Sequence, residues 1–218
     1  LGCISLKSIS QTPCNSLGQN PGTAFPVCGT DTFFQKEVPQ CGGRSIPAPG
    51  CTGLLDLNPF WSRFTCFKSG TFGFLLSPKN LDDYYDWQLF DITGRNPDDV
   101  YSDVSLIVAF NWSAEFRPTG TSNTLGTSLR ECDGPGVNTY SLMPMLIQGH
   151  DYILLISHFT DTPNGYKLSF GGGTANITDP KEPHLDNARA ACDGTQATIK
   201  LNKRMKCNSL TGTGSEFT

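Results

Sequence analysis

Hydrophobic and polar positions alternate with a period of two along residues 58–94, which predicts three strands in succession. The alternation covers the ranges 60–67, 72–76 and 87–92, all rich in aromatic side chains. Period two with aromatic enrichment is typical of half-buried strands. Ser69-Gly70 and the Ser-Pro-Lys-Asn run at 77–80 supply turn residues between them.

Further strands are expected downstream. The range 105–110 is continuously apolar, which predicts a strand covered on both faces, although the pattern alone does not separate it from a buried helical segment. The range 112–139 is polar and glycine-rich and is predicted to leave the sheet. The range 151–170 is predicted to form a hairpin around the turn at 161–165. Seven to nine such strands predict an all-β, jelly-roll-like sandwich of two sheets.

The chain divides into four parts by composition. Residues 1–57 are loop-rich, with short strands expected at 23–27 and 32–34, and are predicted to form a disulfide-stapled arm packed on the sandwich. Residues 58–173 form the sandwich, and 174–184 a linker. Residues 185–218, with a strand at 196–201, are predicted to be the first strands of a truncated Ig-like domain, which cannot bury a core alone.

The composition supports the prediction of an all-β chain and disfavours nucleic acid as a partner. Among 218 residues there are 23 Gly, 15 Pro and 14 Phe, and only 17% are charged, which favours an all-β chain rich in turns. The net charge of -4 disfavours nucleic acid, because phosphate backbones need clustered Lys and Arg. No apolar run reaches about 18 residues, so no membrane span is expected. We expect an exported product whose signal peptide has been removed, with residues 214–218 either natural or a cloning scar.

Cysteine is abundant, with nine residues: Cys3, Cys14, Cys28, Cys41, Cys51, Cys66, Cys132, Cys192 and Cys207. No Cys-x-x-Cys pair is present, so disulfides in an oxidising, extracellular compartment are expected rather than zinc. The odd total leaves one thiol without a partner in this chain. The spacings Cys28–Cys41 and Cys41–Cys51 favour local closures, each stabilising by about 3 kcal/mol, but spacing does not determine connectivity.

A cluster of oxygen-bearing side chains is the main candidate metal site. Calcium takes six to eight oxygen ligands, and the candidates are Asn80, Asp82, Asp83, Asp86 and Asp91. The alternative is a solvated acidic loop before a strand. A second acidic loop lies at 96–103. No cofactor other than Ca2+ is expected.

The sequence contains no coherent catalytic set, so we expect no enzymatic activity. There is no Gly-x-Ser-x-Gly elbow, and Ser157 and His158, adjacent in a predicted strand, should face opposite sides. His150 lies at a turn. Asp82 and Asp83 lack a neighbour that would raise one carboxyl pKa for glycoside hydrolysis.

The aromatic residues suggest a ligand surface. Trp61 and Trp87 are predicted to fill the core, whereas Tyr84, Tyr85 and Trp112 are candidates for stacking against a ligand such as a sugar.

Residues 60–173 resemble the bacterial pre-peptidase C-terminal domain. The likeness rests on the aromatic strand 60–67, on Gly-Thr-Phe-Gly-Phe at 70–74, on Asp-Trp-Gln-Leu-Phe-Asp at 86–91 and on the segments 149–154 and 166–170. It implies a non-catalytic jelly roll appended to secreted enzymes and surface proteins, some of which bind calcium.

A wider likeness includes the arm. The segments 27–30, 38–43, 58–61, 64–67 and 86–94 resemble the N-terminal regions of very large Bacteroidota surface proteins. That likeness implies Ig-like or PKD-like repeats downstream and export, in connection with gliding motility, by the type IX secretion system.

Three functions follow as hypotheses. The leading one is a non-enzymatic module of a cell-surface adhesin or fibre that contacts a surface, a glycan or a protein. The alternatives are a substrate-binding accessory domain of a secreted hydrolase and a structural subunit of an extracellular filament completed by copies of the same protein.

Overall fold

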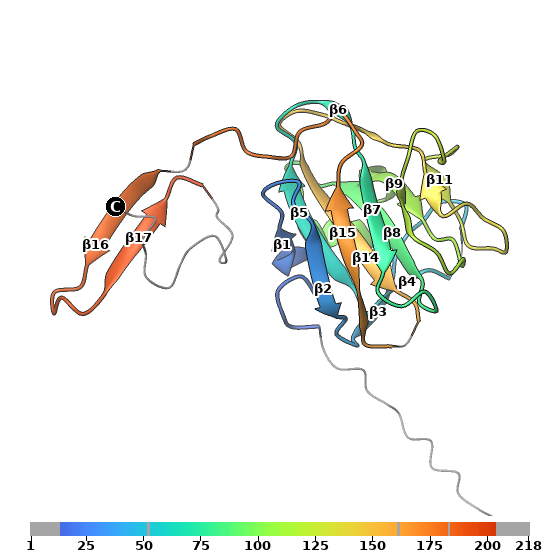
Figure 1. The fold of residues 1–218 in the computed structure, drawn as a ribbon, viewed down its shortest axis with the longest axis horizontal. Coiled ribbons are helices and arrows are strands. Elements are labelled where there is room, and N and C mark those ends of the chain that lie inside the picture. Colours follow the sequence, from blue (N-terminus) through green and yellow to red (C-terminus); the bar gives the residue numbers. More distant parts are fainter. Residues whose placement is uncertain (1–13, 52, 161, 183, 204–218) are drawn as a thin grey trace, which may run out of the picture.

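Two β-sheets packed face to face form the body of the protein (Figure 1). The computed structural model describes residues 14–51, 53–160, 162–182 and 184–203. Sheet A contains, in spatial order, β1 (Phe25–Pro26), β5 (Phe60–Thr65), β14 (Asp151–His158), β8 (Tyr85–Asp91), β9 (Ile107–Asn111) and β11 (Arg130–Glu131). Sheet B contains β12 (Tyr140–Ser141), β10 (Thr119–Thr121), β7 (Phe74–Pro78), β15 (Asn164–Phe170) and β2 (Phe33–Glu37). The prediction of an all-β sandwich is confirmed.

Smaller elements complete the described chain. Three strand pairs lie outside the two sheets: β3 (Gly42–Ser45) with β4 (Leu55–Leu57), β6 (Gly70–Thr71) with β13 (Met145–Leu146), and β16 (Leu185–Ala190) with β17 (Ala197–Leu201). The helical elements are the 3-10 turns η1 (Pro21–Thr23), η2 (Pro97–Tyr101) and η3 (Val104–Leu106). Within the described residues, no helix has the length and apolar character needed to cross a bilayer.

The main core fills the space between the two sheets. Tyr85, Trp87 and Leu89 point into it from β8, because alternate residues of a strand face opposite sides. Leu76 of β7 and Leu168 of β15 meet them from sheet B. Burying a large apolar side chain contributes about 1.5–3 kcal/mol, so this layer fixes the two sheets relative to each other.

The outer face of sheet A is covered as well. Trp61, Phe90 and Ile153 project from β5, β8 and β14 into a second apolar cluster, with Ile46 of the arm and Val100 of η2. Both Trp61 and Trp87 are fully buried, as expected for core residues. Since sheet A is covered on two sides, β14 is buried at every residue but its first and shows no alternation.

The predicted strands at 60–67, 72–76 and 87–92 correspond to β5, β7 and β8. The apolar run at 105–110 passes through η3 into β9, which is covered on both faces as predicted.

Two sequence-based predictions about connections are wrong. The range 151–170 is not a hairpin, because β14 pairs with β5 and β8 in sheet A while β15 pairs with β7 and β2 in sheet B. The turn between them links the two sheets. The range 112–139 does not leave the sheets, because β10 extends sheet B and β11 extends sheet A. Two apolar strands joined by a turn look alike whether they pair or face each other across a core.

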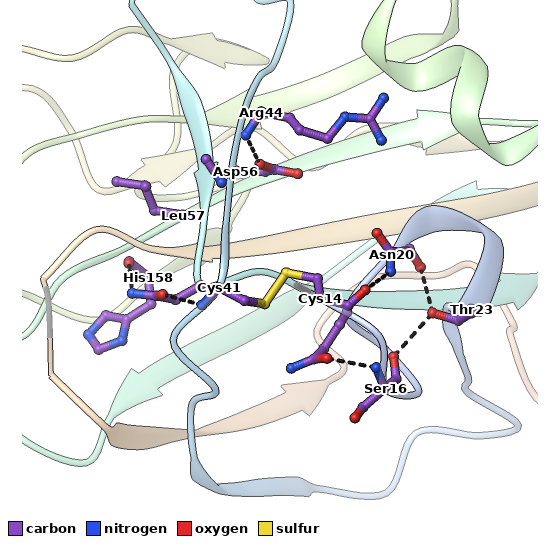
Figure 2. The surroundings of a disulfide bond; sticks show 12 residues. Cys14, Ser16, Asn20, Thr23, Cys41, Arg44, Asp56, Leu57 and His158 are labelled. Atoms are coloured by element: carbon purple, nitrogen blue, oxygen red, sulfur yellow. Dashed lines mark hydrogen bonds between the residues drawn. A yellow bond between two sulfur atoms is a disulfide. The ribbon is translucent and has the colours of Figure 1, made fainter. Parts of the chain in front are cut away.

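The N-terminal arm both covers and completes the sandwich. It supplies β1 to the edge of sheet A and β2 to the edge of sheet B. The disulfide Cys14–Cys41 closes the arm on itself (Figure 2), and Cys51–Cys132 joins it to the loop after β11. The expected local closures Cys28–Cys41 and Cys41–Cys51 are therefore wrong, because Cys41 is bonded to Cys14 and Cys51 to Cys132.

A buried carboxylate anchors the β3–β4 pair beside the first disulfide. Asp56 accepts hydrogen bonds from the backbone N–H of Gly43 at 3.0 Å and of Arg44 at 2.5 Å (Figure 2). The Tyr101 hydroxyl donates to its other oxygen at 2.6 Å. Burial raises the pKa of Asp56 above its usual value, although these hydrogen bonds oppose the shift.

The remaining cysteines differ in exposure. Among the described residues, Cys28, Cys66 and Cys192 form no disulfide, and of these Cys66 is fully buried. Cys3 and Cys207 lie outside the described residues.

The strand pair β16–β17 buries almost nothing. Every side chain of β16 is exposed, and in β17 only Leu201 is partly covered. The two strands hydrogen-bond to each other. A hairpin with both faces open needs additional chain to form a core.

Candidate functional site

An exposed group of three aromatic rings lies where several strands of sheet A end. Tyr84 immediately precedes β8, Phe159 immediately follows β14, and Phe116 lies in the loop after β9. The ring centres of Tyr84 and Phe159 are 5.1 Å apart with the planes nearly parallel, and those of Tyr84 and Phe116 are 5.0 Å apart with the planes nearly perpendicular. We call these three residues the aromatic cluster.

Strand register places Tyr84 and Phe159 together. His158 of β14 lies opposite Tyr85 of β8, so the next positions outward, Phe159 and Tyr84, are neighbours on the other face of the sheet. The backbone N–H of Tyr84 donates to the hydroxyl of Thr160 at 3.1 Å, which fixes this end. Two of the three rings are therefore positioned by the sheet, and Phe116 reaches them from the loop after β9.

The rings are unusually open to solvent for aromatic residues so close to a core. Phe116 is 52% exposed and Phe159 is 53% exposed, while Tyr84 is half-buried between them. Exposed apolar surface costs free energy in water, and contiguous exposed patches often mark binding surfaces.

Two carboxyl groups lie next to the aromatic cluster. Asp86 points to the same face of β8 as Tyr84, is 3% exposed, and has an oxygen, Oδ1, without a hydrogen-bond partner among the described residues. Asp133 is exposed and follows Cys132, which the disulfide to Cys51 holds in place.

The electrostatics show that these groups act on one another. Burial, followed by the negative charge of Asp133, raises the pKa of Asp86 well above its usual value. Burial, together with the charges of Asp86 and Asp133, also raises the pKa of the Tyr84 hydroxyl. Asp86 and Tyr84 therefore both hold their protons more tightly than free side chains do, and the charge that acts on both is that of the exposed Asp133.

A buried polar group lies behind the aromatic cluster, on the core side of β8. The ring of His158 stacks on Tyr85 with centres 4.3 Å apart, and its Nε2 lies 3.7 Å from Asp83 Oδ1. The Thr162 hydroxyl donates to the same oxygen at 2.9 Å, and the Tyr85 hydroxyl donates to the carbonyl of Asn164. These contacts connect the ends of β8, β14 and β15.

The other histidine of the sandwich also pairs with an acid. His150 Nδ1 lies 2.7 Å from Asp91 Oδ2 at the opposite end of β8. Ser157, next to His158, faces away from it as predicted and donates to the carbonyls of Leu55 and Leu57.

The residues expected to bind calcium are not brought together. Asp83 and Asp86 are buried on opposite faces at the start of β8, Asp91 ends that strand, and Asp82 and Asn80 lie in the turn before it. No three His, Cys, Asp or Glu side chains gather as metal ligands within the part of the chain described. Asp83 and Asp86 are close in sequence, but they are three residues apart where β8 begins, so their side chains point to opposite faces of the sheet.

Of the residues expected to contact a ligand, Tyr84 is in the aromatic cluster and the other two are misassigned. Tyr85 is 2% exposed and Trp112 is 3% exposed, and both pack into apolar cores. Sequence reasoning missed Phe116 and Phe159. A signal existed for Phe159, which follows a long apolar strand and precedes turn residues, but nothing in the sequence around Phe116 links it to Tyr84.

An apolar groove of about 540 Å³ opens at the edge of the sandwich. Its lining includes Phe25 of β1, Phe33 and Phe34 of β2, and Leu168 of β15. Phe34 is 66% exposed. None of the three rings of the aromatic cluster lines this groove.

Comparison of the chain with models of known protein families, with curated proteins and with solved structures finds no match.

Proposed function

We propose that this chain is a non-enzymatic binding module of a large extracellular protein, and that it contacts its ligand through the aromatic cluster. The observation that carries the proposal is the exposure of Phe116 and Phe159 beside Tyr84, at one end of sheet A. Binding residues held by a rigid scaffold lose little entropy when a ligand docks.

Two further observations support a large extracellular protein. Two disulfides bind the arm to itself and to the sandwich, and such bonds persist in oxidising compartments. The β16–β17 hairpin, open on both faces, fits a chain that continues into another domain. A parent protein of the Bacteroidota surface type, exported by type IX secretion, belongs to the same proposal. The sequence that follows Thr218 in the parent gene tests it.

The binding role is tested on printed glycan and peptide arrays. The wild-type protein should bind a subset of spots, and the triple variant Tyr84→Ala, Phe116→Ala, Phe159→Ala should lose at least about 90% of that signal, since ring contacts dominate such interfaces. The control is Phe34→Ala, which removes a more exposed ring from the edge groove. Binding that survives the triple variant, or no binding at all, would contradict the proposal.

A filament subunit is the second candidate, because the open hairpin could be completed by a neighbouring copy. Analytical ultracentrifugation of the chain separates the two: concentration-dependent oligomers that disappear when residues 185–218 are deleted would favour the filament. A monomer at all concentrations would exclude it.

A further inference from the structure

The two carboxyl groups beside the aromatic cluster have no basic partner. In the described part of the chain, Asp151 pairs with Arg63 and Asp186 with Lys200, but neither Asp86 nor Asp133 forms an ion pair. Arg117, the residue after Phe116, is exposed and makes no ion pair with either carboxylate.

Burial makes ionisation of Asp86 costly in the absence of a nearby positive charge. Its Oδ1 atom is out of contact with water and accepts no hydrogen bond from the described residues. The pKa of Asp86 is accordingly raised, so that the protonated form is favoured. A cation bound near Tyr84 would favour the ionised form, whereas a neutral ligand would not.

The aromatic rings suit the same kind of ligand. The faces of Tyr and Phe rings carry negative electrostatic potential and attract ammonium and guanidinium groups within about 6 Å. In the aromatic cluster, two rings lie nearly parallel and the third is nearly perpendicular to Tyr84. Different ring faces and edges thus border one small surface.

We infer that the aromatic cluster binds a cationic side chain, lysine or arginine, presented by a protein ligand. The rings contact the apolar part and face of the cation, and the exposed Asp133, whose charge acts on both Tyr84 and Asp86, supplies the negative charge. The overall charge of -4 favours approach of a basic partner. The inference deepens the proposed function and rests on it, because it names the ligand group that the cluster selects.

The test uses small probes that differ in charge alone. N-acetyl-arginine methylamide is titrated into the intact chain while the ring resonances of Tyr84, Phe116 and Phe159 are followed by NMR, and the citrulline counterpart serves as the neutral isostere. We expect the arginine probe to bind at least about fivefold more tightly, the ratio that corresponds to about 1 kcal/mol of cation–π attraction. Equal affinities, or tighter binding of citrulline, would overturn the inference.

Two variants locate the effect. Asp133→Asn, and Phe159→Leu, which retains apolar bulk without the ring, should each weaken arginine binding about threefold. Asp193→Asn, in the turn between β16 and β17, changes the net charge by the same amount and should have no effect. If Asp193→Asn weakens binding as much as Asp133→Asn does, the attraction is that of the whole protein and the inference is wrong.

The array experiment separates this inference from the proposed function. Binding that requires the three rings but is unchanged when lysine and arginine in the bound peptides are replaced by acetyl-lysine and citrulline leaves the proposed function intact and overturns the cationic ligand. Ring-dependent binding to neutral glycans would likewise leave the proposed function intact and overturn the cationic ligand. Binding independent of the rings overturns both.

Discussion

The two ends of β8 and β14 both carry aspartates, but those at one end have hydrogen-bond or ion-pair partners and two at the other end form no ion pair with a described residue. At one end, which we call the His150 end, Asp91 lies beside His150, and Asp151 accepts hydrogen bonds from Arg63 at 2.7 Å and Thr65 at 2.6 Å. At the other, the Tyr84 end, Asp86 is buried with an unpartnered oxygen and Asp133 has no ion-pair partner in the described chain.

The pKa values follow this difference. At the His150 end, burial acts to raise the pKa of Asp91 and of Asp151, but hydrogen bonds from His150 and Thr93 to the first, and from Thr65 and Arg63 to the second, outweigh it and lower both. At the Tyr84 end nothing opposes burial, and the pKa of Asp86 is raised. The carboxylates of the His150 end are hydrogen-bonded within the protein, whereas Asp86 is buried without such compensation from the described residues.

The largest expected effect on stability comes from removing the disulfide that lies near the Tyr84 end. The disulfide Cys51–Cys132 spans 81 residues and holds the loop that carries Asp133. Replacing both cysteines by Ala should lower the free energy of unfolding by about 4.5 kcal/mol, since a long closed loop restricts the unfolded chain most. Urea denaturation followed by tryptophan fluorescence measures this. The shorter Cys14–Cys41 loop, of 27 residues, should cost about 1 kcal/mol less to open, and the reverse order would contradict the account.

The next effect concerns the sign of a pH dependence at the Tyr84 end. Because the pKa of Asp86 is raised in the folded state, the folded protein binds a proton more tightly than the unfolded chain. Its stability is therefore lost as pH rises above the unfolded value near 3.9, by up to about 1.4 kcal/mol per pH unit until the folded pKa is passed. Asp86→Asn removes this loss, so the variant should gain stability relative to wild type between pH 4 and 7. Thermal melts across that range measure the difference, and a constant difference would contradict it.

The His150 end should show the opposite trend with a smaller amplitude. The pKa of Asp151 is lowered in the folded state, so its contribution is present above the unfolded value and is lost as pH falls toward the folded one. Asp151→Asn should cost about 1 kcal/mol at pH 7, a value reduced because the pair with Arg63 is partly exposed. The difference from wild type should vanish at low pH. Parallel pH trends for Asp86→Asn and Asp151→Asn would remove the contrast between the two ends.

The sequence predicts the sandwich because its physical signal is local. Period-two alternation with aromatic residues depends on neighbours along one strand, and β5, β7 and β8 all display it. Pairing between strands is a non-local property. β14 and β15 look like a hairpin in sequence although they lie in different sheets, and Cys51 finds its partner 81 residues away.

The candidate site was only partly predictable for the same reason. Alternation in β8 determines that Tyr84 and Tyr85 face opposite sides, but the sequence does not say which side is covered, and sheet A is covered on both along most of its length. Tyr84 lies just before β8 begins and is partly accessible, whereas Tyr85 and Trp112 are buried. Phe159 joins the cluster through the register of β14 with β8, and Phe116 through a loop; both are non-local contacts that no single segment encodes.

The smallest expected effect is on the stability of aromatic-cluster variants, and it decides whether the cluster belongs to the core or to a ligand. Phe116 remains 52% exposed, so Phe116→Ala should lower the free energy of unfolding by less than about 1 kcal/mol, the remaining contact with Tyr84 accounting for most of it. Phe90→Ala, at a fully buried position of the same sheet, should cost about 3–5 kcal/mol. Urea denaturation of both variants measures the contrast. A cost for Phe116→Ala close to that of Phe90→Ala would mean that the ring serves packing. The side chains of the Tyr84 end would then, like those of the His150 end, make their main contacts within the protein itself.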